Sequence, residues 1–263
     1  MQQSIFYPSK ELAPFISHYV SLASKETPSR LLSYQDFPRT AMDMVFTFDG
    51  SIQIKRTAKT TFSLHKYEFI GLFNSAYHVQ VENSISALHI RFKPNGVYPL
   101  TKVPLHYILN SHLSLTELMG NSIDDLYQQM GALSNQSEKI NLLESWLRPF
   151  YQRDRLHYRM EYGIQLIEQQ KGLISVKTLS EQLNTNYKSL DRWFQKMVGV
   201  SPKAYIQMSR FKNILSQLDQ QKEADWIQLT VDHGFYDQAH FIKSFKQFAG
   251  ITPAVYQSRN LPQ

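Results

Sequence analysis

The stretch NYKSLDRWFQKMVGVSPKAY, residues 186–205, recurs in modified form as DQAHFIKSFKQFAGITPAVY, residues 237–256. When the two stretches are aligned, apolar, basic, glycine and proline positions coincide. The matched pairs include Asn186 with Asp237, Leu190 with Phe241, Arg192 with Lys243, Phe194 with Phe245, Gly199 with Gly250, and Pro202 with Pro253. A repeat of this kind determines the architecture, because each copy is one supersecondary unit.

Each copy predicts a short helix with one buried face. Asn186 and Asp237 are expected to cap these helices, because their side-chain oxygens accept hydrogen bonds from the free amides of the first turn. The apolar residues that follow have the i, i+4, i+7 spacing of a buried stripe. They are Leu190, Phe194 and Met197 in one copy and Phe241, Phe245 and Phe248 in the other. The remaining face of each helix is polar and is expected to be exposed.

A shorter amphipathic segment precedes each copy. Ser180 and Thr230 place small side chains where this segment must cross the following helix. Asn184 and Gly234 supply turn residues that tolerate a positive φ. Two helices joined by a tight turn, the second with a polar outer face, are the layout of a helix-turn-helix, whose second helix enters the major groove of DNA.

A longer stretch carries a family resemblance. Residues 233–256, HGFYDQAHFIKSFKQFAGITPAVY, resemble the signature of the AraC/XylS family of bacterial transcription regulators, and residues 157–258 resemble its tandem helix-turn-helix domain. The resemblance implies binding to double-stranded promoter DNA and action with RNA polymerase, commonly as an activator. A cytoplasmic location is the default expectation, because the sequence shows no signal peptide and no membrane span.

The chain departs from the family pattern in a few positions. Asn184 replaces a turn glycine, and Ser180 and Thr230 replace alanines. Asp191 stands where a neutral polar residue is usual, and its charge would repel phosphate. We therefore expect Asp191 either to accept a hydrogen bond from a cytosine amino group or to hold Arg192.

The repeat alignment names the side chains expected to meet DNA, although long basic side chains are often simply solvated. Base contacts are expected from Lys188, Asp191, Arg192, Gln238, His240 and Lys243. Phosphate contacts are expected from Tyr187, Lys203, Arg210 and Lys246. Between the two copies, a helical stripe from Pro202 to about Gln221 predicts a rod of about 25 Å. Such a rod would hold the two reading helices roughly one DNA turn, about 34 Å, apart.

The N-terminal part reads as β-structure. Residues 44–54, MVFTFDGSIQI, predict a hairpin because Asp49-Gly50 is a strong turn pair. Further strands are expected at 60–64, 68–73, 77–81 and 86–92. Residues 89–104 resemble the sensor domains of one subgroup of the family, which are small cupin-like β-barrels. This resemblance implies a small-molecule effector.

The expected effector pocket rests on inward-facing aromatic residues, with an arginine as an anchor for an anion. Its candidates are Phe46, Phe48, Phe73, Arg91 and Phe92. The alternative is that the aromatic rings fill a small barrel and that Arg91, which alternates with Ile90 and Phe92, faces solvent. The histidines of this part show no ligand spacing, so no metal and no cofactor is expected.

Residues 105–152 have helical periodicity. The family resemblance implies that such helices pair two subunits, and the alternative is that they pack on the barrel of the same chain. The predicted fold is α+β. Its parts are a β-barrel, cupin-like domain at 1–104, a helical linker at 105–152, and an all-α domain at 153–263 with two helix-turn-helix motifs joined by a long helix.

Composition limits the remaining function classes. The chain has no cysteine, which excludes thiolate metal sites, disulfides and a cysteine nucleophile, as in a repair alkyltransferase. The net charge is +6 at pH 7, and residues 172–263 hold most of the excess. No signal peptide or membrane span is expected. The alternatives to a transcription regulator are a cupin-type metal enzyme fused to a DNA-binding domain and a module that binds only a protein partner.

Overall fold

The fold is α+β, with a β-sheet domain followed by helices. The computed structural model describes residues 2–24, 32–57, 60–220 and 225–260. The strands are β1 (Gln2–Phe6), β2 (Ile16–Ala23), β3 (Leu32–Asp36), β4 (Asp43–Thr57), β5 (Thr60–Leu64), β6 (Tyr67–Ile70), β7 (Tyr77–Phe92) and β8 (His112–Ser114). The helices before the repeat are α1 (Tyr98–Thr101), α2 (Leu115–Met119), α3 (Ser122–Ala132), α4 (Gln136–Leu147) and α5 (Arg155–Gln169), with 3-10 turns η1 (Leu105–Ile108) and η2 (Arg148–Phe150). The repeat holds α6 (Val176–Gln182), α7 (Tyr187–Met197), α8 (Pro202–Gln220), α9 (Trp226–Asp232), α10 (Gln238–Ala249) and α11 (Pro253–Asn260).

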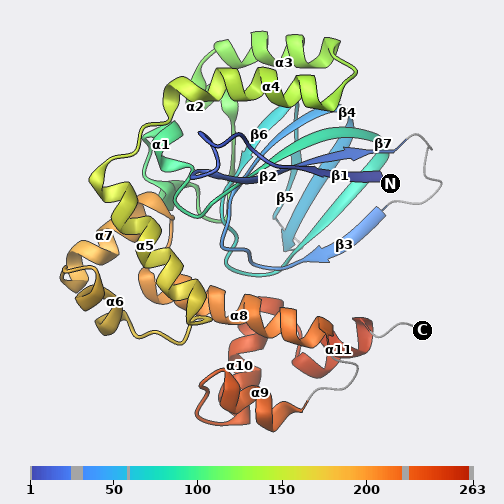
Figure 1. Cartoon of the computed structure of the whole chain (residues 1–263). Coiled ribbons are helices and arrows are strands. Elements are labelled where there is room, and N and C mark those ends of the chain that lie inside the picture. The colour runs from blue at the N-terminus through green and yellow to red at the C-terminus, as the bar shows by residue number, and fades with distance from the viewer. Residues whose placement is uncertain (1, 25–31, 58–59, 221–224, 261–263) are drawn as a thin grey trace.

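The predicted barrel is wrong in one respect: the sheet is not closed. Among the described strands, the hydrogen-bonded order is β1-β2-β7-β4-β6-β8, with β3 beside β7 and β5 beside β4. All pairings are antiparallel. Since β1 and β8 stand at opposite ends of this path, the sheet is an open, curved one (Figure 1). Strand β8 also extends the sheet into the region whose sequence predicts helix.

One long strand, β4, stands where the sequence predicts a hairpin, and a second, β7, stands where it predicts two strands, 77–81 and 86–92. Asp49-Gly50 does not turn the chain back, because β4 runs through both residues and pairs with β7 on either side of them. The register shifts at this point, and Gly50 has φ 79°. A Cβ at Gly50 would meet the Ser84 carbonyl oxygen at 2.0 Å, so the glycine allows a bulge against a close neighbouring strand.

The alternation of side chains along these strands separates the residues of the expected effector pocket. Phe46 and Phe92 are fully buried in the larger apolar cluster, whereas Phe73 belongs to a smaller cluster of the sheet domain. Arg91 alternates away from its neighbours and forms an ion pair with Asp43, with Nη2 to Oδ2 at 2.7 Å. Phe46, Phe48 and Phe92 share the larger cluster, whereas Phe73 and Arg91 lie apart from it, so the five side chains do not form the single expected pocket of Phe46, Phe48, Phe73, Arg91 and Phe92.

The linker helices pack on the sheet of the same chain. Ile123, Met130 and Leu143 of α3 and α4 are fully buried in the cluster that also holds Phe46. Tyr19 of β2 donates a hydrogen bond to the Glu144 carboxylate of α4 at 3.0 Å. These helices cover one side of the sheet domain in Figure 1. Within the described residues, none of the helices has the length and apolar character that a bilayer crossing requires.

Candidate nucleic-acid interface

The two helix-turn-helix units share their local geometry. Asn186 accepts a hydrogen bond from the Ser189 amide at the start of α7, and Asp237 accepts one from the His240 amide at the start of α10. Both caps satisfy an amide that has no partner inside its helix. The helices therefore begin at equivalent residues of the two copies.

The turns are built alike, with one difference. Ser180 and Thr230 are buried, and each donates its hydroxyl to the carbonyl four residues earlier, at 2.6 Å. Asn184 and Gly234 adopt φ values of 46° and 65°, the left-handed conformation that the sequence predicts for the turn. The second turn is one residue longer and exposes Tyr236, whose side chain is 93% accessible.

The apolar stripe of each reading helix is buried as predicted. Leu190 and Phe194 of α7 are fully buried, and Phe241 and Phe245 of α10 are 1% exposed. Trp193 is half-buried beside Arg159 of α5, whose guanidinium carbon lies 4.6 Å from the indole ring centroid. Burial of one face leaves the opposite face of each helix to present polar side chains.

Most of the predicted contact residues have accessible side chains. Lys188, Arg192, Gln238, His240, Lys243, Tyr187, Lys203 and Lys246 are exposed. Asp191 is half-buried, and among the described residues no ion pair joins it to Arg192. The carboxylate of Asp191 is thus not held by its basic neighbour.

Arg210 differs from the other predicted phosphate contacts. It is half-buried on α8, and burial lowers the pKa of its guanidinium. Its Nε donates to the Gly172 carbonyl at 3.1 Å, and its guanidinium carbon lies 5.5 Å from the Phe235 ring centroid. These contacts tie the end of α5 to the second motif, so Arg210 has a structural role in the fold.

Helix α8 connects the two motifs as a single rod. Its 19 residues span about 28 Å at 1.5 Å per residue. Tyr205, Phe211 and Ile214 are buried along it, and the ring of Phe211 stacks on Phe248 at 5.1 Å between centroids. Figure 1 shows α6 and α7 near one end of α8 and α9 and α10 along its other part. The rod therefore fixes the separation of the two motifs.

The sheet domain contacts the C-terminal end of α10, which the sequence does not reveal. The Ala76 amide donates to the Phe248 carbonyl at 2.8 Å, and the Gln35 side-chain amide donates to the Ala249 carbonyl at 2.9 Å. Both carbonyls belong to the last turn of the helix, where partners inside the helix are missing. The sheet domain thereby supplies part of the C-terminal cap of one reading helix.

The other reading helix is contacted at its equivalent end. His106 of η1 has Nδ1 3.4 Å from the Gln195 carbonyl oxygen, and Lys196 Nζ lies 4.7 Å from the Tyr98 ring centroid. Gly199, just beyond α7, is so close to η1 that a Cβ would lie 3.0 Å from the Leu105 carbonyl oxygen. The sheet domain therefore contacts the ends of α7 and α10 that lie opposite their capped N-termini.

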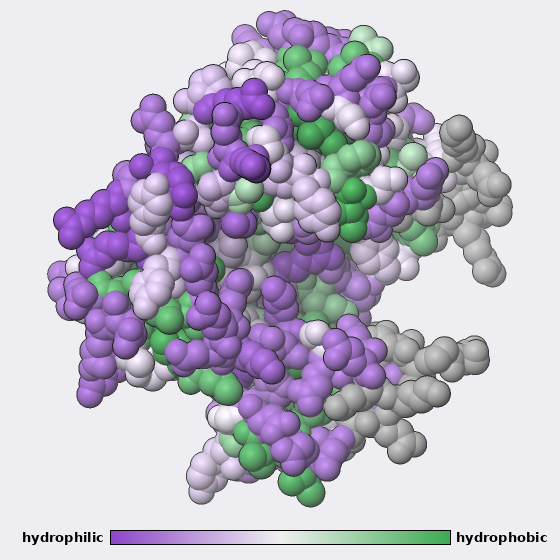
Figure 2. Space-filling model, viewed as in Figure 1, coloured by the Kyte–Doolittle hydropathy of each residue, from purple (hydrophilic) through white to green (hydrophobic). Residues whose placement is uncertain are grey.

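Part of the outward surface of α9 is apolar, unlike the equivalent part of α6, although Gln228 and Asp232 are also exposed on α9. Ile227 and Val231 are 68% and 66% exposed, whereas the equivalent positions of α6 hold Lys177 and Glu181. Figure 2 shows apolar side chains gathered at the end of the molecule that holds α9 and α10. The side chains of the second motif that are predicted to contact DNA lie on α10.

Asn186→Ala and Asp237→Ala are each expected to lower the free energy of unfolding by about 1 kcal/mol, because an amide in the first turn loses its acceptor. Urea denaturation followed by circular dichroism measures the loss. Asn186→Ser and Asp237→Asn keep an acceptor and should retain most of the stability. An alanine variant as stable as the unmodified protein would contradict the capping role.

The family comparison agrees with this geometry. Residues 179–259 match the family described as a helix-turn-helix domain. The C-terminal part is a helix-turn-helix DNA-binding domain of the AraC type. The chain is accordingly a DNA-binding transcription regulator. Residues 4–114 match a family described as a domain of unknown function (DUF6597), so the match adds no activity for the sheet domain.

Solved structures give a looser likeness. ToxT from Vibrio cholerae is 13% identical, with 98% of this chain and 96% of that chain covered and a TM-score of 0.46. A ToxT structure with a bound unsaturated fatty acid is 15% identical, with 89% and 97% covered and a TM-score of 0.44. The AraC-like transcriptional activator CuxR is 15% identical, with 82% and 86% covered and a TM-score of 0.34. No curated protein sequence matches the chain.

The histidine, aspartate and glutamate side chains of the described part of the sheet domain are spread over several strands. Within the described residues, no group of three or more histidine, aspartate or glutamate side chains is placed to hold a metal ion. Burial lowers the pKa of His89 to about 4, so its imidazole is neutral at neutral pH. This histidine lies inside the domain and not in an exposed metal centre.

Proposed function

We propose that the chain activates transcription by binding promoter DNA with α7 and α10 in successive major grooves on one face of the duplex. The observation that carries the proposal is the pair of equivalently capped helices with exposed polar faces on one rod, α8. The length of α8 is close to one turn of B-DNA, which is about 34 Å. In this proposal RNA polymerase is the second partner, and the protein acts in the cytoplasm.

We infer that sequence is read by polar side chains of the first two turns of the two helices, all of them exposed except the half-buried Asp191. Base contacts are assigned to Lys188, Asp191, Arg192, Gln238, His240 and Lys243. Arginine recognises guanine with two hydrogen bonds, and glutamine recognises adenine in the same way. Tyr187, Lys203 and Lys246 are assigned to phosphates. Arg210 is not assigned to a phosphate, because its Nε is bonded to Gly172.

We assign one role to each of the three regions predicted from the sequence. Residues 1–104 form the sensing domain and 153–263 the DNA-binding domain. Residues 105–152 form the helical linker, which packs on the sheet of its own chain and is also the proposed region for pairing two subunits. Strand β8 lies beyond residue 104, so part of the linker also completes the sheet. The hydrogen bonds to Phe248 and Ala249 supply a route by which the sensing domain influences α10.

Mapping of bound sites in cells that produce the full chain tests the function. Bound fragments should lie upstream of genes, and a transcription reporter that carries one of them should increase when the protein is present. Binding to the same fragment in vitro should weaken steeply as salt rises, because phosphate contacts release counterions. Equal binding at low and high salt would contradict the assignment of phosphate contacts, and a decrease in reporter signal would contradict activation.

A further inference from the structure

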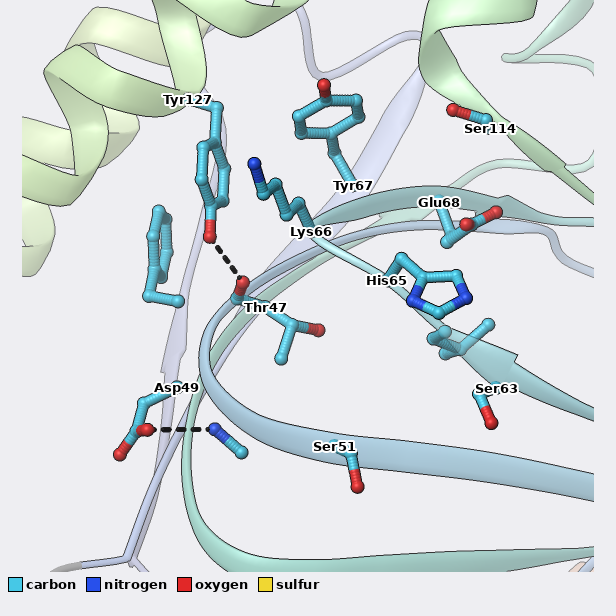
Figure 3. Close-up of a pocket in the computed structure, with 13 residues that line it drawn as sticks. Thr47, Asp49, Ser51, Ser63, His65, Lys66, Tyr67, Glu68, Ser114 and Tyr127 are labelled. Atoms are coloured by element: carbon cyan, nitrogen blue, oxygen red, sulfur yellow. Dashed lines mark hydrogen bonds between the residues drawn. The ribbon is translucent and has the colours of Figure 1, made fainter.

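A hollow in the sheet domain lies outside the DNA-binding part. It has a volume of about 690 Å³ and is bordered by β4, β5, β6 and the side of α3 (Figure 3). Pockets for small molecules commonly measure roughly 300–1,000 Å³. The volume of the hollow lies within this range.

Two polar groups in its wall lack partners. Glu68 is 4% exposed and its Oε2 has no hydrogen-bond partner in the described part of the protein. Thr47 is 6% exposed, and its Oγ1 likewise has none. The two residues are on adjacent strands, since the Thr47 amide donates to the Lys66 carbonyl and Val45 is paired with Glu68. Buried polar atoms are nearly always bonded to protein, water or a ligand. This pair points to a ligand that donates hydrogen bonds.

Positive charge and aromatic rings lie beside Thr47 in the same hollow. Lys66 Nζ lies 6.0 Å from the Tyr127 ring centroid, and Tyr127 stacks on Phe48 with centroids 5.5 Å apart. Figure 3 shows the end of Lys66 between Tyr127 and Tyr67, with Glu68 beyond Tyr67 and next to His65. A purely cationic ligand would be repelled by Lys66, and a purely anionic ligand would be repelled by the Glu68 carboxylate. A molecule with one charge of each sign fits both.

We propose that this hollow binds a small zwitterion that carries a primary amine and a carboxylate. The amine donates to Glu68 and Thr47, and the carboxylate is received by Lys66. Burial raises the pKa of the Glu68 carboxyl, and an ammonium group beside it would favour the ionised form. The proposal rests on the proposed function, in which this ligand is the effector.

Contacts from α3 reach the same hollow. The Tyr127 hydroxyl donates to the Thr47 carbonyl at 2.9 Å, and the Tyr67 hydroxyl donates to the Asp124 carboxylate at the start of α3. Tyr127 and Tyr67 also lie edge to face, with centroids 5.3 Å apart. A ligand that orders these rings would act directly on α3, a helix of the proposed pairing linker.

The proteinogenic amino acids are the probes, each added to the full chain and followed by thermal shift and then by isothermal titration. At least one should bind, and its N-acetyl and methyl-ester derivatives should bind roughly tenfold or more weakly, because each loses one charged contact. Glu68→Gln and Lys66→Met should weaken binding by a similar factor while circular dichroism stays unchanged. Lys10→Met and Glu181→Gln, at exposed positions outside the hollow, should have no effect.

Absence of binding by every amino acid would overturn the proposal. So would binding that Glu68→Gln leaves unchanged, or a polyol such as ribitol that binds as well as the amino acid. A DNA-binding assay tests the proposed function independently of the ligand. The Glu68→Gln protein should still bind the mapped DNA fragment when no amino acid is present. If the unmodified protein failed to bind this fragment, the regulator assignment would be wrong, whatever the result of the amino-acid titrations.

Discussion

Phe245→Ala is expected to lower the free energy of unfolding by about 3–5 kcal/mol and to abolish DNA binding through loss of the fold. Phe245 is 1% exposed, and its ring lies 5.3 Å from that of Phe211 and 5.8 Å from that of Tyr256 between centroids. It therefore joins α10 to both α8 and α11. Truncation leaves a cavity between three helices, which rigid neighbours fill only in part.

Urea denaturation of the full chain, followed by circular dichroism, measures this effect. Ile242→Ala is the control, because Ile242 lies on the same helix but is 42% exposed. Ile242→Ala should lower the free energy of unfolding by less than about 1 kcal/mol, since surface substitutions usually have small effects. If Phe245→Ala is as mild as Ile242→Ala, the second motif does not depend on this aromatic cluster.

The helical part was predictable because each local signal agreed with the tertiary arrangement. Asn186, Asp237 and Gly250 mark the ends of helices through their own backbone preferences, which need no distant partner. The buried stripes follow from the helical period alone. Because the sequence contains two copies of the same pattern, equivalent positions can be compared, and a wrong interpretation of a position in one copy is detected from the other.

The sheet part was less predictable because its geometry depends on strands far apart in the sequence. Asp49-Gly50 is a hairpin signal when read locally, yet β7 pairs along both halves of β4 and keeps the strand continuous. Phe73 of the expected pocket belongs to a different apolar cluster from Phe46 and Phe92, and sequence periodicity cannot show which cluster a residue joins. Glu68 has no motif around it, and only the structure shows that it is buried at the wall of a hollow.

The contacts between the sheet domain and the reading helices also leave no sequence signal. Ala76 donates through its backbone amide, and the acceptor is a backbone carbonyl of Phe248, so the identity of neither side chain is informative. Gln35 is an ordinary polar residue in β3 until its partner at the end of α10 is known. Such contacts arise from chain topology, which is why a sequence pattern predicts the reading helices but not the domain that holds them.

Arg192→Ala is expected to weaken binding to a mapped promoter fragment by roughly five- to a hundredfold, because a two-bonded contact with guanine is worth about 1–3 kcal/mol. Arg192 is exposed on α7, so the substitution should leave the fold intact. Lys243→Ala, at the equivalent position of α10, should weaken binding to the other half of the site. Arg192→Lys keeps the charge but loses the forked geometry, so a base contact predicts that it also loses affinity.

Salt dependence distinguishes a base contact from a phosphate contact at these positions. Loss of a phosphate contact reduces the slope of log affinity against log salt by about one. Loss of a base contact leaves this slope unchanged and weakens the preference of the protein for one base pair. Lys10→Ala, an equal charge change at an exposed position of the sheet domain, is the control and should bind as the unmodified protein does. Normal affinity and normal sequence preference in both Arg192→Ala and Lys243→Ala would mean that the aligned polar faces do not read DNA. The equivalence of the two copies would then reflect shared folding constraints alone, because caps, stripes and turn residues are needed for the fold whether or not the outer faces bind.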